Sequence, residues 1–166
     1  YHHAFLGGLL EHTLSVAKLG DLIAPLYPGL NRDLLICGIV LHDIGKISEL
    51  CYEKSFHYSD EGQLIGHLIS GVLMVEEKAK QIDDFPKTLL DLLRHLILSH
   101  HGEYEWGSPK LPMTLEALTL HYLDNIDAKI HAFDKAISSD KDSSDNWTNY
   151  NRMLERKLFK KSHEYV

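Results

Sequence analysis

The chain has 166 residues, 44% of them hydrophobic and 25% charged, which is enough for one globular domain with a buried core. Its net charge of -7 excludes an overall basic surface that would bind nucleic acid by charge alone. No apolar run reaches about 18 residues, so no membrane span is expected. Its two cysteines are too few for a disulfide framework, and Cys37 is predicted to be a small core residue in a cytoplasmic protein.

The first half of the chain contains two predicted helices and an irregular segment. Apolar residues at helical spacing predict a helix over residues 4–24, which Pro25 ends. Asn31 is suited to capping a second helix over residues 32–44. Residues 46–59 show no regular pattern and are expected to be irregular.

The second half completes an all-α fold of about six helices, with no predicted strand. A third helix is expected from Ser59 or Asp60 to about Gln81. A fourth begins near Asp84 or Pro86 and precedes a loop at 102–113 that is rich in aromatic and acidic residues. The last two helices are expected at 114–137, capped by Thr114, and at 147–161, after a polar linker.

A His-Asp pair follows directly on the apolar run at residues 34–41 of the second predicted helix. His42 and Asp43 occupy its predicted last turn, Gly45 suits the left-handed position that ends a helix, and Lys46 comes next. A carboxylate buried beside an imidazole is costly unless something compensates for it. A metal ion is an economical compensation, since both groups are metal ligands.

Other helices also place polar groups on or near their apolar faces. They are His12 on the first helix, His67 on the third, His100 and His101 on the fourth and Asp124 on the fifth. A single such histidine is usually a core residue satisfied by a hydrogen bond. With five such places in one small helical domain, either each group is satisfied separately or all of them converge on one site.

The order of these residues resembles the HD-domain superfamily of metal-dependent phosphohydrolases. Longer strings resemble the YhaM family of bacterial cytoplasmic 3′-to-5′ exoribonucleases, and they lie at residues 7–13, 42–46, 65–67, 100–109 and 120–129. The resemblance covers about residues 2–129. It implies an upstream OB domain in full-length members, so a chain that starts at Tyr1 rather than Met is expected to be a fragment whose 166 residues form the HD domain.

The resemblance also implies a ligand set for two divalent cations. The first cation would be held by His12, His42, Asp43 and Asp124, and Asp43 would bridge to a second cation held by His67 and His100. His101 would be a further ligand or a substrate contact, and Lys46 would pair with a phosphate oxygen. Mn²⁺ is favoured, while Co²⁺, Fe, Ni and Zn also suit imidazole and carboxylate ligands.

The predicted function is hydrolysis of single-stranded RNA, or of single-stranded DNA, from its 3′ end through a metal-activated hydroxide. The alternative is an HD nucleotidase or cyclic-nucleotide phosphodiesterase that acts on small nucleotides. Two further interpretations of the predicted site are a di-iron oxygenase and a purely structural metal site. Lys46 favours a phosphate substrate over both.

For three features of the sequence, more than one interpretation stays open. Tyr104 or Trp106 in the 102–113 loop either stacks a base or packs within the loop. Asp127, one turn after Asp124, either supports the site or is a surface acid. Basic residues of the last predicted helix either form a solvated face or contact RNA or a second subunit in a homo-oligomer; these are Arg152, Arg156, Lys157, Lys160 and Lys161.

Overall fold

The computed structural model describes residues 7–51, 57–140 and 145–161. The chain divides into two compact units, one up to Asn125 and one from Ile126 to Val166. Every predicted metal ligand lies in the first unit. In the part of the chain that the structure describes, no helix is long and apolar enough to cross a membrane.

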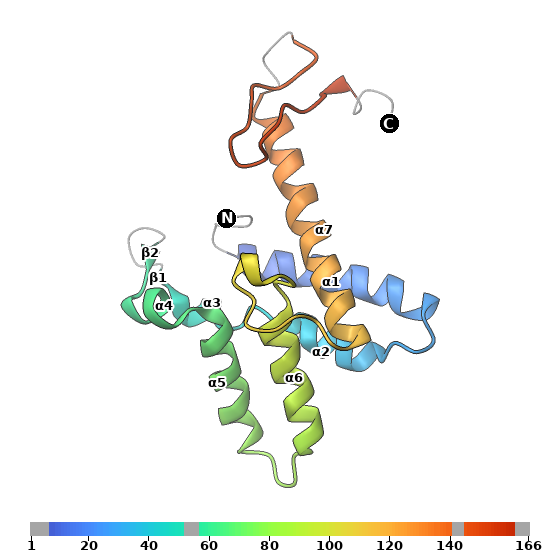
Figure 1. Ribbon diagram of the computed structural model, residues 1–166, viewed down its shortest axis with the longest axis vertical. Helices are drawn as coiled ribbons and strands as arrows, with labels where there is room; N and C mark the ends of the chain where they lie inside the picture. The colour runs from blue at the N-terminus through green and yellow to red at the C-terminus, as the bar shows by residue number, and fades with distance from the viewer. Residues whose placement is uncertain (1–6, 52–56, 141–144, 162–166) are drawn as a thin grey trace. The chain divides into compact units, whose positions relative to one another are not determined.

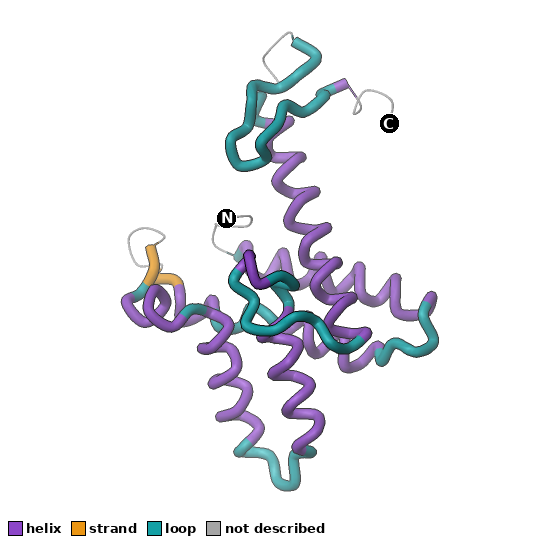
Figure 2. The backbone as a smooth tube through the Cα atoms, viewed as in Figure 1, coloured by secondary structure: helices purple, strands orange, loops and turns teal. Residues whose placement is uncertain are grey.

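Helices dominate the first unit, as Figure 2 shows, and this confirms the predicted all-α class. Figure 1 labels the elements in chain order: α1 (Gly8–Ile23), η1 (Ala24–Leu26), α2 (Arg32–Leu41), α3 (Lys46–Glu49), β1 (Leu50–Cys51), β2 (His57–Tyr58), α4 (Asp60–Ile65), α5 (His67–Ala79), α6 (Lys87–Ser99), η2 (Tyr104–Trp106) and α7 (Leu115–Ser138). α5 and α6 form an antiparallel pair, and α2 packs against both α1 and α6.

Side-chain caps begin three of these helices where the sequence predicts them. The Leu34 amide donates to the Asn31 side chain at 3.1 Å, and the Gly62 amide donates to the Ser59 hydroxyl at 2.9 Å. The Ala117 amide donates to the Thr114 hydroxyl at 3.1 Å. Each cap satisfies an amide that has no partner within its own helix, so local sequence determines where these helices start.

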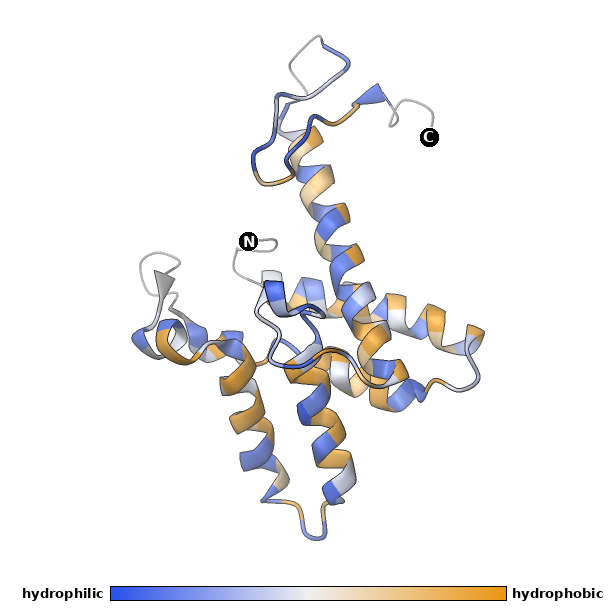
Figure 3. Cartoon of the chain, in the orientation of Figure 1, coloured by the Kyte–Doolittle hydropathy of each residue, from blue (hydrophilic) through white to orange (hydrophobic). Residues whose placement is uncertain are grey.

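The core of the first unit is built from α1, α2, α6 and the first half of α7. Val16, Leu35, Ile39, Ile97 and Leu120 are all 0% exposed and belong to one apolar cluster. Figure 3 shows apolar residues alternating with polar ones along these helices, as expected for helices with one buried face. Most of the predicted metal ligands lie at the ends and inner faces of the same helices, and His67 lies at the start of α5.

The predicted third helix is interrupted at Gly66. This residue has φ +77°, a left-handed conformation that glycine adopts without strain, and it ends α4 and precedes α5. Periodicity did not reveal the break because the apolar positions continue across it. The break makes His67 the first residue of α5.

The segment expected to be irregular, 46–59, instead contains α3 and an antiparallel β-hairpin whose two strands have two residues each, where no strand was predicted. Residues 52–56 lie outside the described residues. The prediction for Cys37 is also wrong, since Cys37 is exposed on α2. The buried face of α2 consists of Leu34, Leu35, Gly38 and Ile39, which leaves Cys37 on the opposite face.

The predicted last helix, 147–161, is absent from the second unit. Isolated bridges instead pair Trp147 with Phe159 and Asn151 with Arg156. The Asn151 side chain accepts the amides of Met153 and Leu154 at 2.9 and 3.1 Å, which turns the chain back on itself. This local bonding competes with a helix, so the basic residues of this segment do not form a helical face.

Candidate metal centre

The predicted ligands converge in the first unit from five separate parts of the chain. His12 lies within α1, and His42 and Asp43 follow α2 directly. His67 begins α5, His100 and His101 follow α6, and Asp124 lies on α7. His12, His42, Asp43 and His100 are between 0% and 3% exposed, so most of the cluster is closed to bulk water.

One group of ligand atoms gathers around His12. Its Nε2 lies 3.1 Å from Asp124 Oδ1 and 3.4 Å from His42 Nε2. The ligand atoms of His12, His42 and Asp124 all lie within 4.8 Å of one another. Three such donors at this spacing are arranged as a single cation would require.

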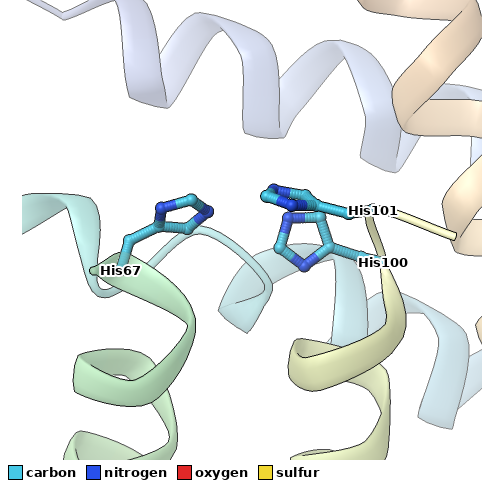
Figure 4. Close-up of side chains that lie close together, drawn as sticks. All are labelled: His67, His100 and His101. Carbon is cyan, nitrogen blue, oxygen red and sulfur yellow. The ribbon is translucent and has the colours of Figure 1, made fainter. Parts of the chain in front are cut away.

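A second group gathers between the start of α5 and the end of α6. The ligand atoms of His67, His100 and His101 also lie within 4.8 Å of one another. Figure 4 shows the His67 ring facing the His100 and His101 rings across this space. The ring centroids of His67 and His101 are 5.2 Å apart, and those of His67 and His100 are 5.8 Å apart.

Asp43 lies between the two groups and faces each with a different oxygen. Its Oδ2 is 3.4 Å from His42 Nε2 and 3.9 Å from His12 Nε2. Its Oδ1 is 3.6 Å from His67 Nε2 and 3.7 Å from His100 Nε2. A carboxylate in this position has the geometry of a bridging ligand.

Three of the histidine rings contact a backbone carbonyl through Nδ1, which leaves Nε2 as the atom that could bind a cation. The Nδ1 atoms of His42 and His100 lie 2.7 and 2.8 Å from the carbonyl oxygens of Ile39 and Ile97, three residues earlier. His101 Nδ1 lies 3.0 Å from another backbone carbonyl. A carbonyl oxygen only accepts, so each Nδ1 carries the proton and each Nε2 keeps its lone pair for a ligand.

The electrostatics of the site also favour cation binding. Burial opposes ionisation of Asp43, but the neighbouring charges of His42 and Lys46 hold its pKa well below its usual value. Burial likewise opposes ionisation of Asp124, but the hydrogen bond from His12 and the nearby His42 together outweigh burial and lower the pKa. Burial and the charge on His42 hold the pKa of His100 well below normal, so His100 is a neutral imidazole at pH 7.

The pKa values of His42 and His101 are shifted in opposite directions. Burial lowers the pKa of His42, but the adjacent Asp43 carboxylate outweighs it, and the net shift is upward. Burial and the nearby His67 lower the pKa of His101. The Nζ atom of Lys46 lies 2.5 Å from Asp43 Oδ2, on the same carboxylate that raises the pKa of His42.

The residues present fit a pair of metal ions. Among the described residues, Asp43 Oδ1 and His67 Nε2 are buried and have no hydrogen-bond partner. Burying an acceptor and a donor-acceptor group without partners is costly, and a cation between them would remove that cost. The donors are imidazole and carboxylate, the ligands typical of divalent first-row metals.

Gly45 is required for a different reason from the predicted one. Among the described glycines, Gly45 is not one of those with a positive φ angle, so it does not end α2 in the left-handed conformation that was predicted. A Cβ at Gly45 would instead lie 2.0 Å from the His67 carbonyl oxygen and 2.7 Å from the Gly71 amide nitrogen. The absence of a side chain lets the His-Asp turn press against the first turn of α5, which brings Asp43 close to His67.

Two residues that support the ligands were not identified as such from sequence. Glu49 lies 3.3 Å from His67 Nδ1, and it comes from the segment expected to be irregular. His121 is buried and places Nδ1 2.8 Å from the His100 carbonyl oxygen. A Cβ at Gly102 would lie 2.2 Å from the His121 ring, so Gly102 and His121 pack directly together behind His100.

The 102–113 loop begins beside His101. Trp106 supplies the carbonyl that contacts His101 Nδ1, and its ring centroid is 5.9 Å from that of His121. Tyr104 and Trp106 are 62% and 52% exposed. The Ser108 hydroxyl contacts the carbonyl of Leu98, which ties the loop to α6. Base stacking by these aromatic residues stays a prediction.

The part of the chain that contains this site is similar to known proteins. The HD domain family model matches residues 9–129, which include every predicted ligand. The chain is 48% identical to the 3′-5′ exoribonuclease YhaM of Bacillus subtilis over 136 residues, which are 82% of this chain and 43% of that protein. It is 45% identical to the protein of the same name from a Geobacillus strain, over 82% of this chain and 42% of that protein.

The chain spans less than half the length of these curated relatives. No solved structure matches it significantly. The family match covers most of the chain and confirms the resemblance predicted from the order of its histidines and aspartates. The chain therefore belongs to the HD domain family.

Proposed function

We propose that the chain is the hydrolytic domain of a cytoplasmic, metal-dependent 3′-5′ exoribonuclease that acts on single-stranded RNA. The observation that supports it most strongly is the position of Asp43, whose two oxygens face two separate groups of ligands. In this proposal, one divalent cation is held by His12, His42, Asp43 and Asp124, and a second by Asp43, His67 and His100. Mn²⁺ is the favoured metal, and Co²⁺ is the next choice.

Two cations in such a site polarise phosphate oxygens and supply a hydroxide nucleophile near neutral pH. The chain's own residues do the remaining work. Asp43 and Asp124 carry the negative charge that holds cations, because their depressed pKa values keep them ionised. His101, which is less buried than His100, contacts the substrate phosphate.

Lys46 is the residue that we assign to the phosphate. It begins α3, its side chain is 29% exposed, and its Nζ contacts Asp43 Oδ2. With Asp43 holding cations, the Lys46 ammonium group would be able to pair with a phosphate oxygen at the edge of the site. An ammonium group at the edge of the site favours a phosphate substrate over a purely structural metal.

RNA as the substrate is supported by the names of the relatives, which are 3′-5′ exoribonucleases. The exposed aromatic residues beside His101 also suit single-stranded bases. The chain is acidic and spans less than half of each relative, so we expect regions outside this segment to contribute to RNA affinity.

The test uses 5′-end-labelled single-stranded RNA with Mn²⁺. It is run on the 166-residue chain and on a full-length protein that contains it. The expected result is a ladder that shortens from the 3′ end, with weaker cleavage by the 166-residue chain. Blunt double-stranded RNA is the control and should be cleaved poorly. If the full-length protein leaves single-stranded RNA intact but hydrolyses mononucleotides or cyclic dinucleotides, the exoribonuclease proposal is wrong and the small-nucleotide alternative holds.

Replacing Lys46 separates phosphate contact from metal binding. We expect Lys46→Met to lower the rate of RNA cleavage roughly 10- to 100-fold, the effect of losing one charge-assisted hydrogen bond. The number of bound Mn²⁺ ions should not change, because Lys46 donates no ligand. The matched control is Lys87→Met, which breaks an exposed ion pair to Asp91 on α6 and should leave the rate unchanged. Loss of metal from Lys46→Met would contradict the assigned role.

A further inference from the structure

Glu49 is a buried carboxylate that the proposed chemistry does not use. It is the last residue of α3 and is 9% exposed. Its two oxygens lie 3.3 and 3.4 Å from His67 Nδ1. Glutamate is rarely buried unless it is paired, so the pairing of Glu49 with His67 is the feature to explain.

The surrounding backbone holds Glu49 in place. The Ser59 amide donates to the Glu49 carbonyl oxygen at 2.9 Å. A Cβ at Gly62 would lie 2.5 Å from that oxygen and 2.8 Å from Glu49 Cγ, so α4 packs directly against this residue. These contacts from α4 and from the residue that precedes it hold Glu49, at the end of α3, next to His67.

His67 needs such a partner because of its place in the chain. His42 and His100 follow the ends of helices, and each contacts the carbonyl three residues earlier with Nδ1. His67 instead begins α5, so no earlier turn of its own helix offers a carbonyl. A carboxylate from α3 takes the place of that carbonyl.

We propose that Glu49 is a positioning residue that fixes the tautomer and orientation of His67 and thereby sets the affinity of the second cation site. Glu49 accepts the Nδ1 proton, so the lone pair of Nε2 points toward Asp43 Oδ1, 3.6 Å away. That Nε2 is buried and has no hydrogen-bond partner among the described residues, as expected for a ligand atom. The inference rests on the proposed two-cation site.

The test measures stepwise binding of Mn²⁺ alone to the purified chain by calorimetry, with metal content measured in parallel. Two variants are compared with the wild type. Glu49→Met keeps the size of the side chain but removes the acceptor, and Glu49→Gln keeps an acceptor but removes the charge. We expect Glu49→Met to weaken the second binding step about 10- to 100-fold and Glu49→Gln to weaken it less, with the first step unchanged in both.

The matched control is Glu116→Met. Glu116 is also a buried glutamate, 8% exposed, but it accepts the Asn31 amide at the start of α2. Its loss should reduce stability and leave both Mn²⁺ steps unchanged. Nitrogen-15 NMR of the His67 ring gives a readout that general destabilisation would not change: Nδ1 should be protonated in the metal-free wild type, and the tautomers should mix in Glu49→Met.

Each outcome is decisive. If the wild type binds two Mn²⁺ ions and Glu49→Met and Glu49→Gln bind both with unchanged affinity, the role of Glu49 is wrong while the metal site stands. A wild type that binds fewer than two Mn²⁺ ions overturns the two-cation site and this inference together. If Glu49→Met does not fold, Glu49→Gln decides the question, because its amide fits the same space.

Discussion

Asp43→Asn is expected to abolish RNA cleavage by the full-length protein and to reduce the bound Mn²⁺ from two equivalents to one or none. Asp43 faces His42 with one oxygen and His67 with the other, so its charge is shared by both proposed cation sites. We expect a rate loss of about 10³-fold or more, which corresponds to about 4 kcal/mol in the activation barrier. The measurements are metal content and the rate of RNA shortening.

Asparagine keeps the shape of the side chain, so the fold should persist and the effect should be electrostatic. The control is Asp21→Asn, which removes an exposed carboxylate paired with Arg32 on α2 and should change neither measurement. If Asp43→Asn keeps two tightly bound Mn²⁺ ions, Asp43 is not the bridge. Unchanged cleavage would remove it from the mechanism altogether.

The second large effect is expected from Gly45→Ala. The new methyl group would meet two backbone atoms of α5, the His67 carbonyl oxygen at 2.0 Å and the Gly71 amide nitrogen at 2.7 Å. Backbone cannot rotate away as a flexible side chain does, so either the His-Asp turn or α5 must move. We expect a loss of about 3 kcal/mol or more in the free energy of unfolding, measured by urea denaturation.

The same displacement would separate Asp43 from His67, so the second Mn²⁺ equivalent should be lost from any folded fraction. Gly29→Ala is the matched control, since its methyl group would meet a Leu115 side chain at an ordinary 3.5 Å. That variant should be close to the wild type in both stability and metal content. Wild-type stability of Gly45→Ala would show that the contact with α5 is not tight.

Local chemistry explains why much of the helical architecture is predictable from sequence. Asn31, Ser59 and Thr114 cap their helices with the hydrogen bonds that their side chains suggest. The wrong predictions concern segments in which a local backbone conformation or side-chain hydrogen bond competes with the helix. The spacing of apolar residues does not reveal this competition. Gly66 interrupts an unbroken apolar pattern, and the Asn151 side chain captures amides that a helix would have used.

The sequence by itself determined the all-α class, because helical periodicity is a local property of the chain. The order of its histidines and aspartates, through its resemblance to known proteins, also indicated the HD family and a candidate set of ligands. Only the tertiary structure decided that the two oxygens of Asp43 face different groups, that Gly45 is needed for contact with α5, and that Glu49 lies beside His67 Nδ1. These features depend on distances between segments far apart in the chain, which packing of the core sets and spacing in the sequence does not encode.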